Sequence, residues 1–282
     1  MRTLSYKITY LCLLMSICAN IIGQQVDTVE VFSAKMGRNI KNGVILPAGY
    51  FVNDAARFPV LYLLNGAGGR YDTWLRETKK SLPEEASRLN MIIVCPDGQR
   101  SWYWDSPVRA DMQFETYTSH ELVDYIDSHY RTIANPKGRA ITGFSMGGHG
   151  GLWLGIRHPD VYGACGGMCA GVDIRPYPES WNIPNLLGSY SENRLVWEDH
   201  TVINQLHLIR PNTLAIIFDI GRDDFFYENN VKLHQELIYR NIEHDFTVRP
   251  GKHTHEYCHN AIDYQLLFFY KFFQKNIQTE NK

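Results

Sequence analysis

The chain has no excess of charge of either sign. Its 282 residues include 28 Lys and Arg against 30 Asp and Glu, so the formal net charge is −2. No strong electrostatic field therefore attracts it to nucleic acid or anionic lipid, and we expect no nucleic-acid partner. It also lacks internal repeats, low-complexity linkers and the composition of a disordered or collagen-like chain. These absences favour a globular protein, and the length suits one large α/β domain.

Cysteine is sparse, and the residues that hold metals or nucleotides do not occur at the usual spacings. Beyond residue 23 only four cysteines remain: Cys95, Cys165, Cys169 and Cys258. No second Cys pair completes a zinc pattern, and no Gly-Lys-Ser/Thr makes a phosphate-binding loop. We therefore expect neither a metal nor a cofactor. The four thiols are interpreted as buried or incidental, although an exported chain could oxidise some of them in a pairing that sequence cannot fix.

The N-terminus has the layout of a secretory signal peptide. Arg2 and Lys7 are accompanied by no acid, an apolar stretch covers residues 8–19, and small Gly23 precedes two glutamines. The apolar stretch is short for a membrane span. A buried N-terminal helix is the less favoured alternative.

This layout predicts a signal peptide at residues 1–23 and a single domain at residues 24–282 without a transmembrane span. The mature protein is expected to be secreted or periplasmic. Lipid attachment at Cys18 is a weaker option, because the bulky Ile17 before it fits such a site poorly.

Short apolar runs alternate with segments of helical periodicity along the rest of the chain. This alternation predicts an α/β fold, with a mainly parallel central sheet covered by helices on both faces. Residues 172–212 break the rhythm with Pro176, Pro178 and Pro184, and we expect a small cap excursion over the sheet there. The expected strands are 26–33, 43–46, 58–64, 91–95, 139–142, 214–220 and 244–248, and the expected helices are 121–130, 148–158 and 265–273.

The most informative motif is Gly143-Phe144-Ser145-Met146-Gly147. It fits G-x-S-x-G and lies between an expected strand and an expected helix, where a sharp turn exposes a nucleophilic serine. A glycine-rich turn with a chance serine is the alternative. The strand, the additional Gly148 and the partners described next favour a catalytic Ser145.

A serine hydroxyl needs a base and an orienting acid, which in such folds follow in the order Ser, acid, His. His253 comes directly after the last expected strand, and Asp223 and Asp224 follow the strand before it. Chain order alone cannot choose between the two aspartates. The one that does not contact the histidine is expected to face solvent or to cap the helix that follows.

Acyl transfer also needs two backbone N–H donors for the oxyanion. We assign one to Met146, after the nucleophile. The second is assigned to Ala67, in the glycine-rich loop after the third expected strand, with neighbouring Gly68 as the alternative.

With these residues in place, the chain resembles the esterase D / feruloyl esterase family of α/β hydrolases over residues 31–273. The α/β-hydrolase fold and a Ser-His-Asp triad are what the resemblance implies. Its pattern places the acid three residues after Gly221, which selects Asp224. Two departures, Asn65 and His255, affect the expected acyl preference. The matching segments are Leu63–Gly69, Ser101–Pro107, Gly143–Gly148, Gly221–Phe226 and Pro250–His253.

The resemblance implies a serine carboxylesterase that acts on acetyl or feruloyl esters of plant polysaccharides. Trp102, Tyr103 and Trp181 are expected to shape the acyl or sugar pocket, although a role as core aromatics is equally compatible with the sequence. Other possibilities are an S-formylglutathione hydrolase-like thioesterase, which the export signal disfavours, and a mycolyltransferase, for which no acceptor site is evident. A catalytically silent surface binding module is the alternative from another class.

Overall fold

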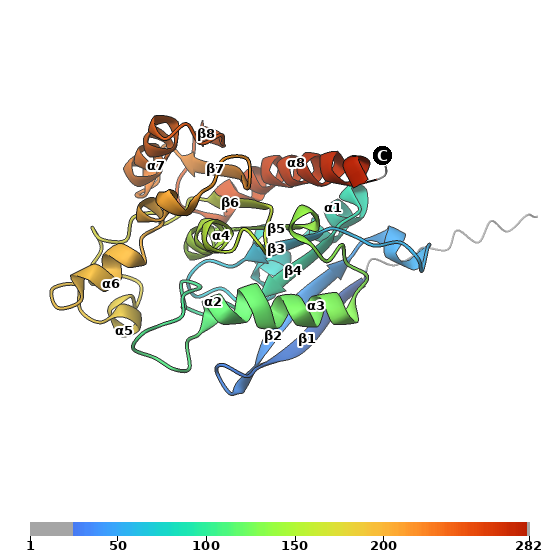
Figure 1. Ribbon diagram of the computed structural model, residues 1–282, viewed down its shortest axis with the longest axis horizontal. Helices are drawn as coiled ribbons and strands as arrows, with labels where there is room; N and C mark the ends of the chain where they lie inside the picture. The colour runs from blue at the N-terminus through green and yellow to red at the C-terminus, as the bar shows by residue number, and fades with distance from the viewer. Residues whose placement is uncertain (1–24, 281–282) are drawn as a thin grey trace, which may run out of the picture.

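One twisted sheet organises the protein, for which a computed structural model describes residues 25–280 (Figure 1). Its order is β1-β2-β4-β3-β5-β6-β7-β8. β1 and β2 form an antiparallel hairpin at one edge, and all the strands from β3 to β8 run parallel. The strands are β1 (Gln25–Ser33), β2 (Arg38–Leu46), β3 (Val60–Leu64), β4 (Ile92–Pro96), β5 (Arg139–Gly143), β6 (Ala164–Met168), β7 (Ala215–Gly221) and β8 (Asp245–Arg249).

Helices cover both faces of this sheet. Adjacent residues of β6 show that both faces are covered, because successive side chains of a strand point to opposite faces of the sheet. A Cβ at Gly166 would meet Gln265 of α8, whereas one at Gly167 would meet the Gly148 carbonyl of α4. The helices are α1 (Leu82–Leu89), α2 (Phe114–Thr116), α3 (Leu122–His129), α4 (Met146–Arg157), α5 (Pro184–Leu187), α6 (Arg194–Asp199), α7 (Tyr227–Tyr239) and α8 (His255–Glu280).

The predicted α/β architecture with a mainly parallel sheet is confirmed, but one of its strands is absent from the prediction. β6 has the sequence Ala-Cys-Gly-Gly-Met, which shows neither a β-branched run nor alternation. Its glycines are required by packing, since a Cβ on Gly166 or Gly167 would come within 2.8 Å of a backbone carbonyl oxygen. The close packing of α4 and α8 therefore explains why β6 lacks the β-branched or alternating residues by which a strand is usually predicted.

Two elements begin well before their predicted starts. β2 begins at Arg38 rather than Gly43, because its first half lies in an exposed hairpin and alternates between polar and apolar residues. α8 begins at His255 rather than Gln265, and its first turns carry polar residues, of which His255 and His259 contact Thr78 in the π-helical turn Trp74–Thr78.

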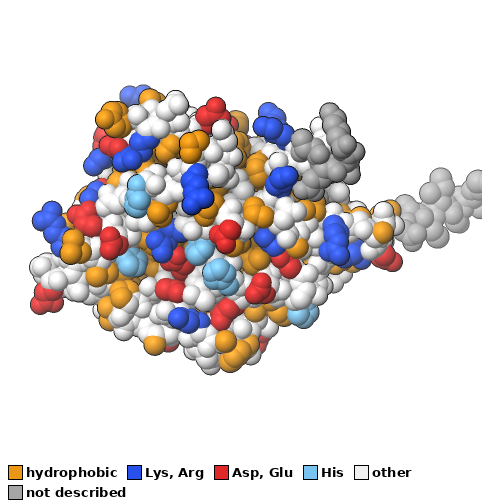
Figure 2. Space-filling model, in the orientation of Figure 1, with side chains coloured by type: hydrophobic (Ala, Val, Ile, Leu, Met, Phe, Trp, Pro, Cys, Tyr) orange, Lys and Arg blue, Asp and Glu red, His pale blue; other side chains and the backbone are white. Residues whose placement is uncertain are grey.

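The excursion predicted at residues 172–212 is an extended loop that carries the short helices α5 and α6, seen at the left of Figure 1. Acidic and basic side chains alternate over the face drawn in Figure 2, as the small net charge would suggest. In residues 25–280 no helix is long and apolar enough to span a membrane. The predicted signal peptide and Cys18 fall outside the described residues.

Candidate active site

Ser145 occupies a strained turn between β5 and α4. Its φ is 60° and its ψ is −114°, a combination that L-residues rarely adopt. The turn is tight enough to require glycine two residues to either side. A Cβ on Gly143 would lie 2.6 Å from the Gly147 backbone, and one on Gly147 would lie 2.5 Å from the Leu64 carbonyl oxygen. The turn therefore holds the serine hydroxyl at the carboxyl end of the sheet.

His253 connects this hydroxyl to a buried carboxylate. It lies in the loop between β8 and α8, and its Nε2 is 2.8 Å from Ser145 Oγ. Its Nδ1 is 2.8 Å from Asp224 Oδ2, and the Asp224 side chain is fully buried. Because the carboxylate can only accept, Nδ1 carries the proton and Nε2 is free to accept from the serine. Three side chains far apart in the sequence thus form one hydrogen-bonded row.

The two neighbouring aspartates have different surroundings. Asp224 Oδ1 accepts a hydrogen bond of 2.8 Å from the Phe226 amide, which leaves Oδ2 facing His253. Asp223 is exposed, and it does not cap α7: the residue before that helix is Phe226, without a side-chain cap. Of the two expected roles, Asp223 therefore faces solvent and does not cap the helix, because the turn after β7 directs the Asp224 carboxylate, not that of Asp223, toward the start of α7.

A cleft with a volume of about 590 Å³ opens above Ser145 and His253. Its floor includes the glycine-rich loop at residues 66–69, which follows β3. Its other lining residues fall into an aromatic group and a polar group. The aromatic group consists of Phe144, Trp181 and Phe225, and the polar group consists of Thr73, Glu77, Arg100, Thr254 and His255.

The two predicted oxyanion donors lie on either side of Ser145. Met146 is the first residue of α4, where backbone amides have no partner within the helix. Ala67 lines the cleft, and its neighbour Gly66 packs so closely that a Cβ there would be 3.5 Å from that of Ser145. Asn65 fixes this loop, since its Oδ1 accepts from the Gly98 amide at 2.9 Å. A departure noted in the sequence thus has a structural explanation.

Comparison with known proteins agrees with this geometry. A family model named Esterase, described as “Putative esterase”, matches residues 33–269. The chain belongs to the esterase family. It is 33% identical over 129 residues to esterase Rv1288 of Mycobacterium tuberculosis, covering 43% of this chain and 26% of that protein. It is also 33% identical over 174 residues to the diacylglycerol acyltransferase/mycolyltransferase Ag85A of Mycobacterium leprae, covering 59% and 49%.

Solved structures extend the likeness over most of this esterase. A ferulic acid esterase superposes with a TM-score of 0.76 at 28% identity, covering 89% of this chain and 98% of that one. An S-formylglutathione hydrolase from Agrobacterium tumefaciens gives 0.74 at 20% identity, covering 89% and 96%, and so shows the shared α/β-hydrolase fold alone. The two curated relatives are longer proteins, of which this esterase spans about a quarter and about half.

Two of the three aromatic residues predicted to contact substrate are buried below the cleft of the esterase. The Tyr103 hydroxyl lies 3.0 Å from both the amide nitrogen and the Oδ1 of Asn65, and it supports the loop. Trp102 stacks on Trp104 and has 1% of its surface exposed. Neither lines the cleft, which corrects that part of the prediction, whereas Trp181 does line it. Trp102, Tyr103 and Trp181 all have positive φ, as does Ser145.

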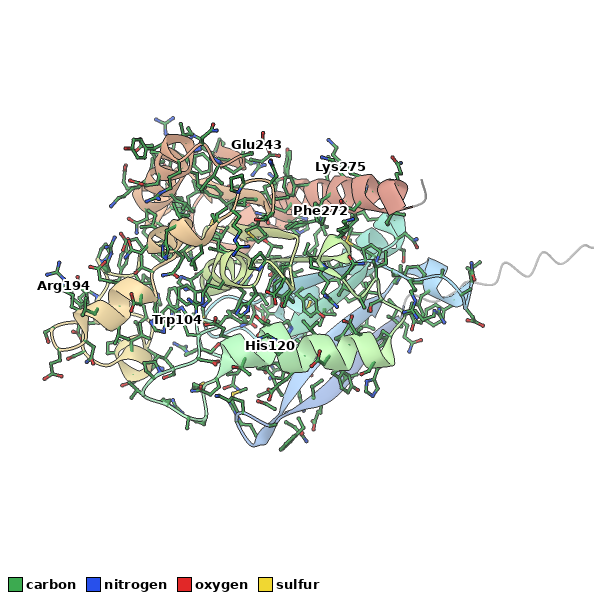
Figure 3. The ribbon with its side chains drawn as sticks, viewed as in Figure 1. Trp104, His120, Arg194, Glu243, Phe272 and Lys275 are labelled. Atoms are coloured by element: carbon green, nitrogen blue, oxygen red, sulfur yellow. The ribbon has the colours of Figure 1, made fainter. Side chains whose placement is uncertain are left out.

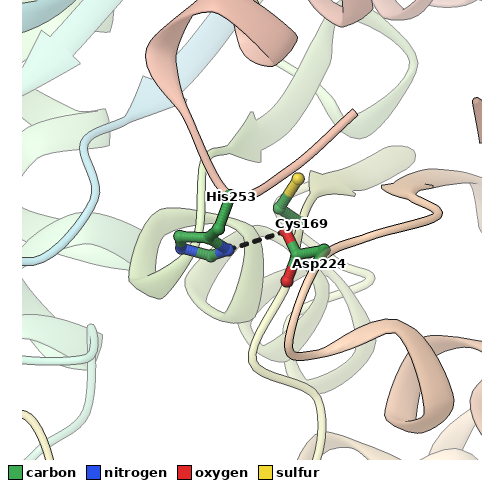
Figure 4. A group of neighbouring side chains, drawn as sticks. All are labelled: Cys169, Asp224 and His253. Atoms are coloured by element: carbon green, nitrogen blue, oxygen red, sulfur yellow. Dashed lines mark hydrogen bonds and ion pairs between the residues drawn. The ribbon is translucent and has the colours of Figure 1, made fainter. Parts of the chain in front are cut away.

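A cysteine that the sequence left without a role lies under the candidate acid. Cys169 Sγ, an oxygen of Asp224 and a nitrogen of His253 all lie within 4.8 Å of one another (Figure 4). Burial raises the pKa of the Cys169 thiol far above its ordinary value, and the neighbouring Cys258 and Asp224 raise it further. It is therefore a neutral thiol beside the carboxylate rather than a thiolate ligand. Both His253 nitrogens are also engaged, so the group is a hydrogen-bond network and not a ligand set.

A buried histidine braces the first turns of α4. Trp104 Nε1 donates to His149 Nε2 at 2.7 Å, so His149 Nδ1 carries the proton and donates to the Gly171 carbonyl at 2.8 Å. Burial lowers the pKa of His149 to about 3, which keeps the ring neutral. Trp104, labelled in Figure 3, also contacts His200 of the excursion. Only tertiary contacts reveal this brace, because a lone histidine in a helix gives no signal of it.

Proposed function

We propose that this esterase is a serine carboxylesterase, exported by residues 1–23, that hydrolyses acetyl or feruloyl esters of plant polysaccharides. Ser145 is the nucleophile, His253 the base and acid, and Asp224 the orienting carboxylate. Met146 and Ala67 supply the oxyanion amides. The observation that carries the proposal is the row of two 2.8 Å contacts from Ser145 Oγ through His253 to Asp224.

The chemistry follows from the atoms in this row. Ser145 Oγ attacks the ester carbonyl while His253 Nε2 takes its proton, and Asp224 stabilises the resulting imidazolium. The oxyanion is held by the two amides. The protonated His253 then gives its proton to the alcohol oxygen as the C–O bond breaks, leaving an acyl ester on Ser145. Water, deprotonated by His253, attacks this ester, and the acid product leaves as Ser145 recovers its proton.

The intact row supports an enzyme over a silent binding module. A binding module has no need for a strained serine, and in such a module the conformational strain at Ser145 would destabilise the fold without serving a function. The likeness to a ferulic acid esterase supports an aromatic acyl group, and the aromatic lining of the cleft is suited to one. The predicted export signal favours an extracellular ester over the glutathione thioester of the cytosol.

The test uses a fluorophosphonate probe and a panel of esters on the chain without residues 1–23. The probe labels wild-type protein at Ser145, and Ser145→Ala is expected to lose both labelling and ester hydrolysis by several orders of magnitude. The circular dichroism spectrum of the variant should be unchanged, because Ala removes one oxygen. Turnover by folded Ser145→Ala close to that of wild type would refute the proposal.

A further inference from the structure

Two histidine side chains that the esterase chemistry does not use meet at one edge of the sheet. His234 lies on α7, and His244 lies just before β8, the last strand in the sheet order. The Nδ1 of His234 is 2.8 Å from the Nε2 of His244, and both residues are half-buried. His244 also lines a surface cavity of about 350 Å³, so solvent reaches the pair. Neither histidine lines the cleft above Ser145.

Hydrogen bonds determine which nitrogens of this pair carry protons. His244 Nδ1 lies 2.8 Å from the Ile242 carbonyl oxygen, which can only accept, so Nδ1 carries the proton and Nε2 presents its lone pair. In the neutral pair His234 Nδ1 therefore donates to that lone pair. Burial, and then the neighbouring His244, lower the pKa of His234, which favours the neutral ring. If the shared proton moves to His234 Nε2, two facing nitrogens become free as ligands, and metals bind the neutral imidazole.

Aromatic rings hold the two imidazoles in place. The His244 ring stacks on Phe218 of β7 with centroids 5.7 Å apart, and the His234 ring stacks on Phe246 of β8 with centroids 4.5 Å apart. Histidines that bind metals usually donate their other ring nitrogen to a backbone carbonyl or a carboxylate, and His244 already does so through Ile242. The pair is therefore largely ordered before any ligand binds, which lowers the entropic cost of binding.

The distance between the two nitrogens indicates which kind of cation fits. Neighbouring nitrogen ligands on a square-planar ion, each at about 2.05 Å, lie about 2.9 Å apart. The observed 2.8 Å is close to that value. Ligands of a tetrahedral ion such as Zn²⁺ lie about 3.3 Å apart at the same bond length. Cu²⁺ prefers a square-planar or tetragonal arrangement and has the highest affinity for nitrogen ligands among the divalent first-row metals.

We propose that His234 and His244 form a binding site for Cu²⁺, with the ion in place of the proton that the two rings share. Each ring tilts so that its lone pair points at the ion, and water supplies the remaining ligands. Asp224 precedes α7 and His253 follows β8. A bound ion therefore links the two elements that lead to the acid and the base of the catalytic row.

Isothermal titration of Cu²⁺ at pH 7, into the protein prepared for the ester assays, tests this site. His234→Phe keeps a ring against Phe246 and removes one ligand, so the Kd of the tightest site should rise at least about tenfold. Zn²⁺ should bind wild type at least about tenfold more weakly than Cu²⁺. His129→Phe is the matched control, because His129 is an exposed histidine that also stacks on an aromatic ring, and it should leave the Kd unchanged.

A second measurement needs no variant. The electron paramagnetic resonance spectrum of wild type with one equivalent of Cu²⁺ should show coupling to two imidazole nitrogens. Three results would overturn the site: the same tightest Kd in folded His234→Phe and wild type, Zn²⁺ binding as tight as that of Cu²⁺, or coupling to a single nitrogen in wild type. If His234→Phe does not fold, the spectrum and the Zn²⁺ comparison decide. Ester hydrolysis and labelling of Ser145 without added copper test the esterase proposal separately.

Discussion

The buried carboxyl group of Asp219 provides a test of how the unfolding free energy of the protein depends on pH. It lies on β7 with 1% of its surface exposed, and Gln265 of α8 donates to its Oδ2 at 2.7 Å. Arg249 of β8 is 3.6 Å from Oδ1, and Tyr257 of α8 also faces the carboxyl group. Burial raises the pKa of Asp219 to about 6, although Gln265, Arg249 and Tyr257 partly oppose the increase.

This pKa predicts how stability depends on pH. The carboxyl group has a pKa of about 3.9 in the unfolded chain and about 6 in the folded protein. Between these values the folded state binds a proton that the unfolded state does not, so the free energy of unfolding falls as pH rises. The contribution is fully present below about pH 4 and lost above about pH 6. It amounts to about 3 kcal/mol, because each unit of difference between the folded and unfolded pKa values corresponds to about 1.4 kcal/mol.

Asp219→Asn removes this dependence and keeps an oxygen that accepts from Gln265. Relative to wild type, the variant should therefore gain about 3 kcal/mol in unfolding free energy between pH 4 and pH 7. Urea denaturation at a series of pH values measures the difference, and equal m-values check that the unfolded states are comparable. Asp245→Asn, at an exposed position of β8, is the control. A stability difference between Asp219→Asn and wild type that is the same at pH 4 and pH 7 would refute the reasoning.

Three further predictions concern the site and the N-terminus. Asp224→Asn should lower kcat by about 10³–10⁴-fold, because the neutral amide no longer stabilises the imidazolium and, with its oxygen held by the Phe226 amide, turns its NH2 toward His253 Nδ1 and favours the wrong tautomer, whereas exposed Asp223→Asn should change kcat little; steady-state kinetics that showed the reverse would exchange their roles. Cys169→Ala should lower kcat several-fold more than Cys169→Ser, because it leaves a void beside the buried Asp224 carboxylate where Ser keeps a polar side chain of similar size; equal kcat values in the two folded variants would argue against it. Exported protein should begin near residue 24 in N-terminal sequencing, and a start at Met1 would contradict the signal peptide.

The central strands could be predicted because each is a short apolar run bounded by turn residues, as in Val60–Leu64 and Ile92–Pro96. β6 could not, because its identity depends on two helices that pack against its glycines from opposite faces. No short stretch of the sequence contains that information. The same holds for the start of α8, whose polar first turns are stabilised by Thr78 and Lys79 far away in the sequence.

The serine turn was predictable because its constraint is local: glycines at fixed positions make a turn that little else can form. The partners of Ser145 were predictable as candidates by their order along the chain. The support under Asp224 was not, since Cys169 directly follows β6, Cys258 belongs to α8, and the two meet only in the folded protein. The roles of the aromatic residues were the hardest to predict, because nothing in the sequence indicates that Trp102 is buried and Trp181 is partly exposed.

The positive φ angles around the cleft have a consequence for adaptation to heat. Ser145, Cys169, Trp102, Tyr103 and Trp181 all have φ angles between 49° and 61°. Each such residue costs on the order of 1–3 kcal/mol, a cost that glycine largely avoids. Mutations that relax these positions are therefore among the easiest routes to greater stability, and they lie at the nucleophile or in the segments that line or support the cleft. A library selected only for heat resistance should lose its catalytic turn long before it loses its fold.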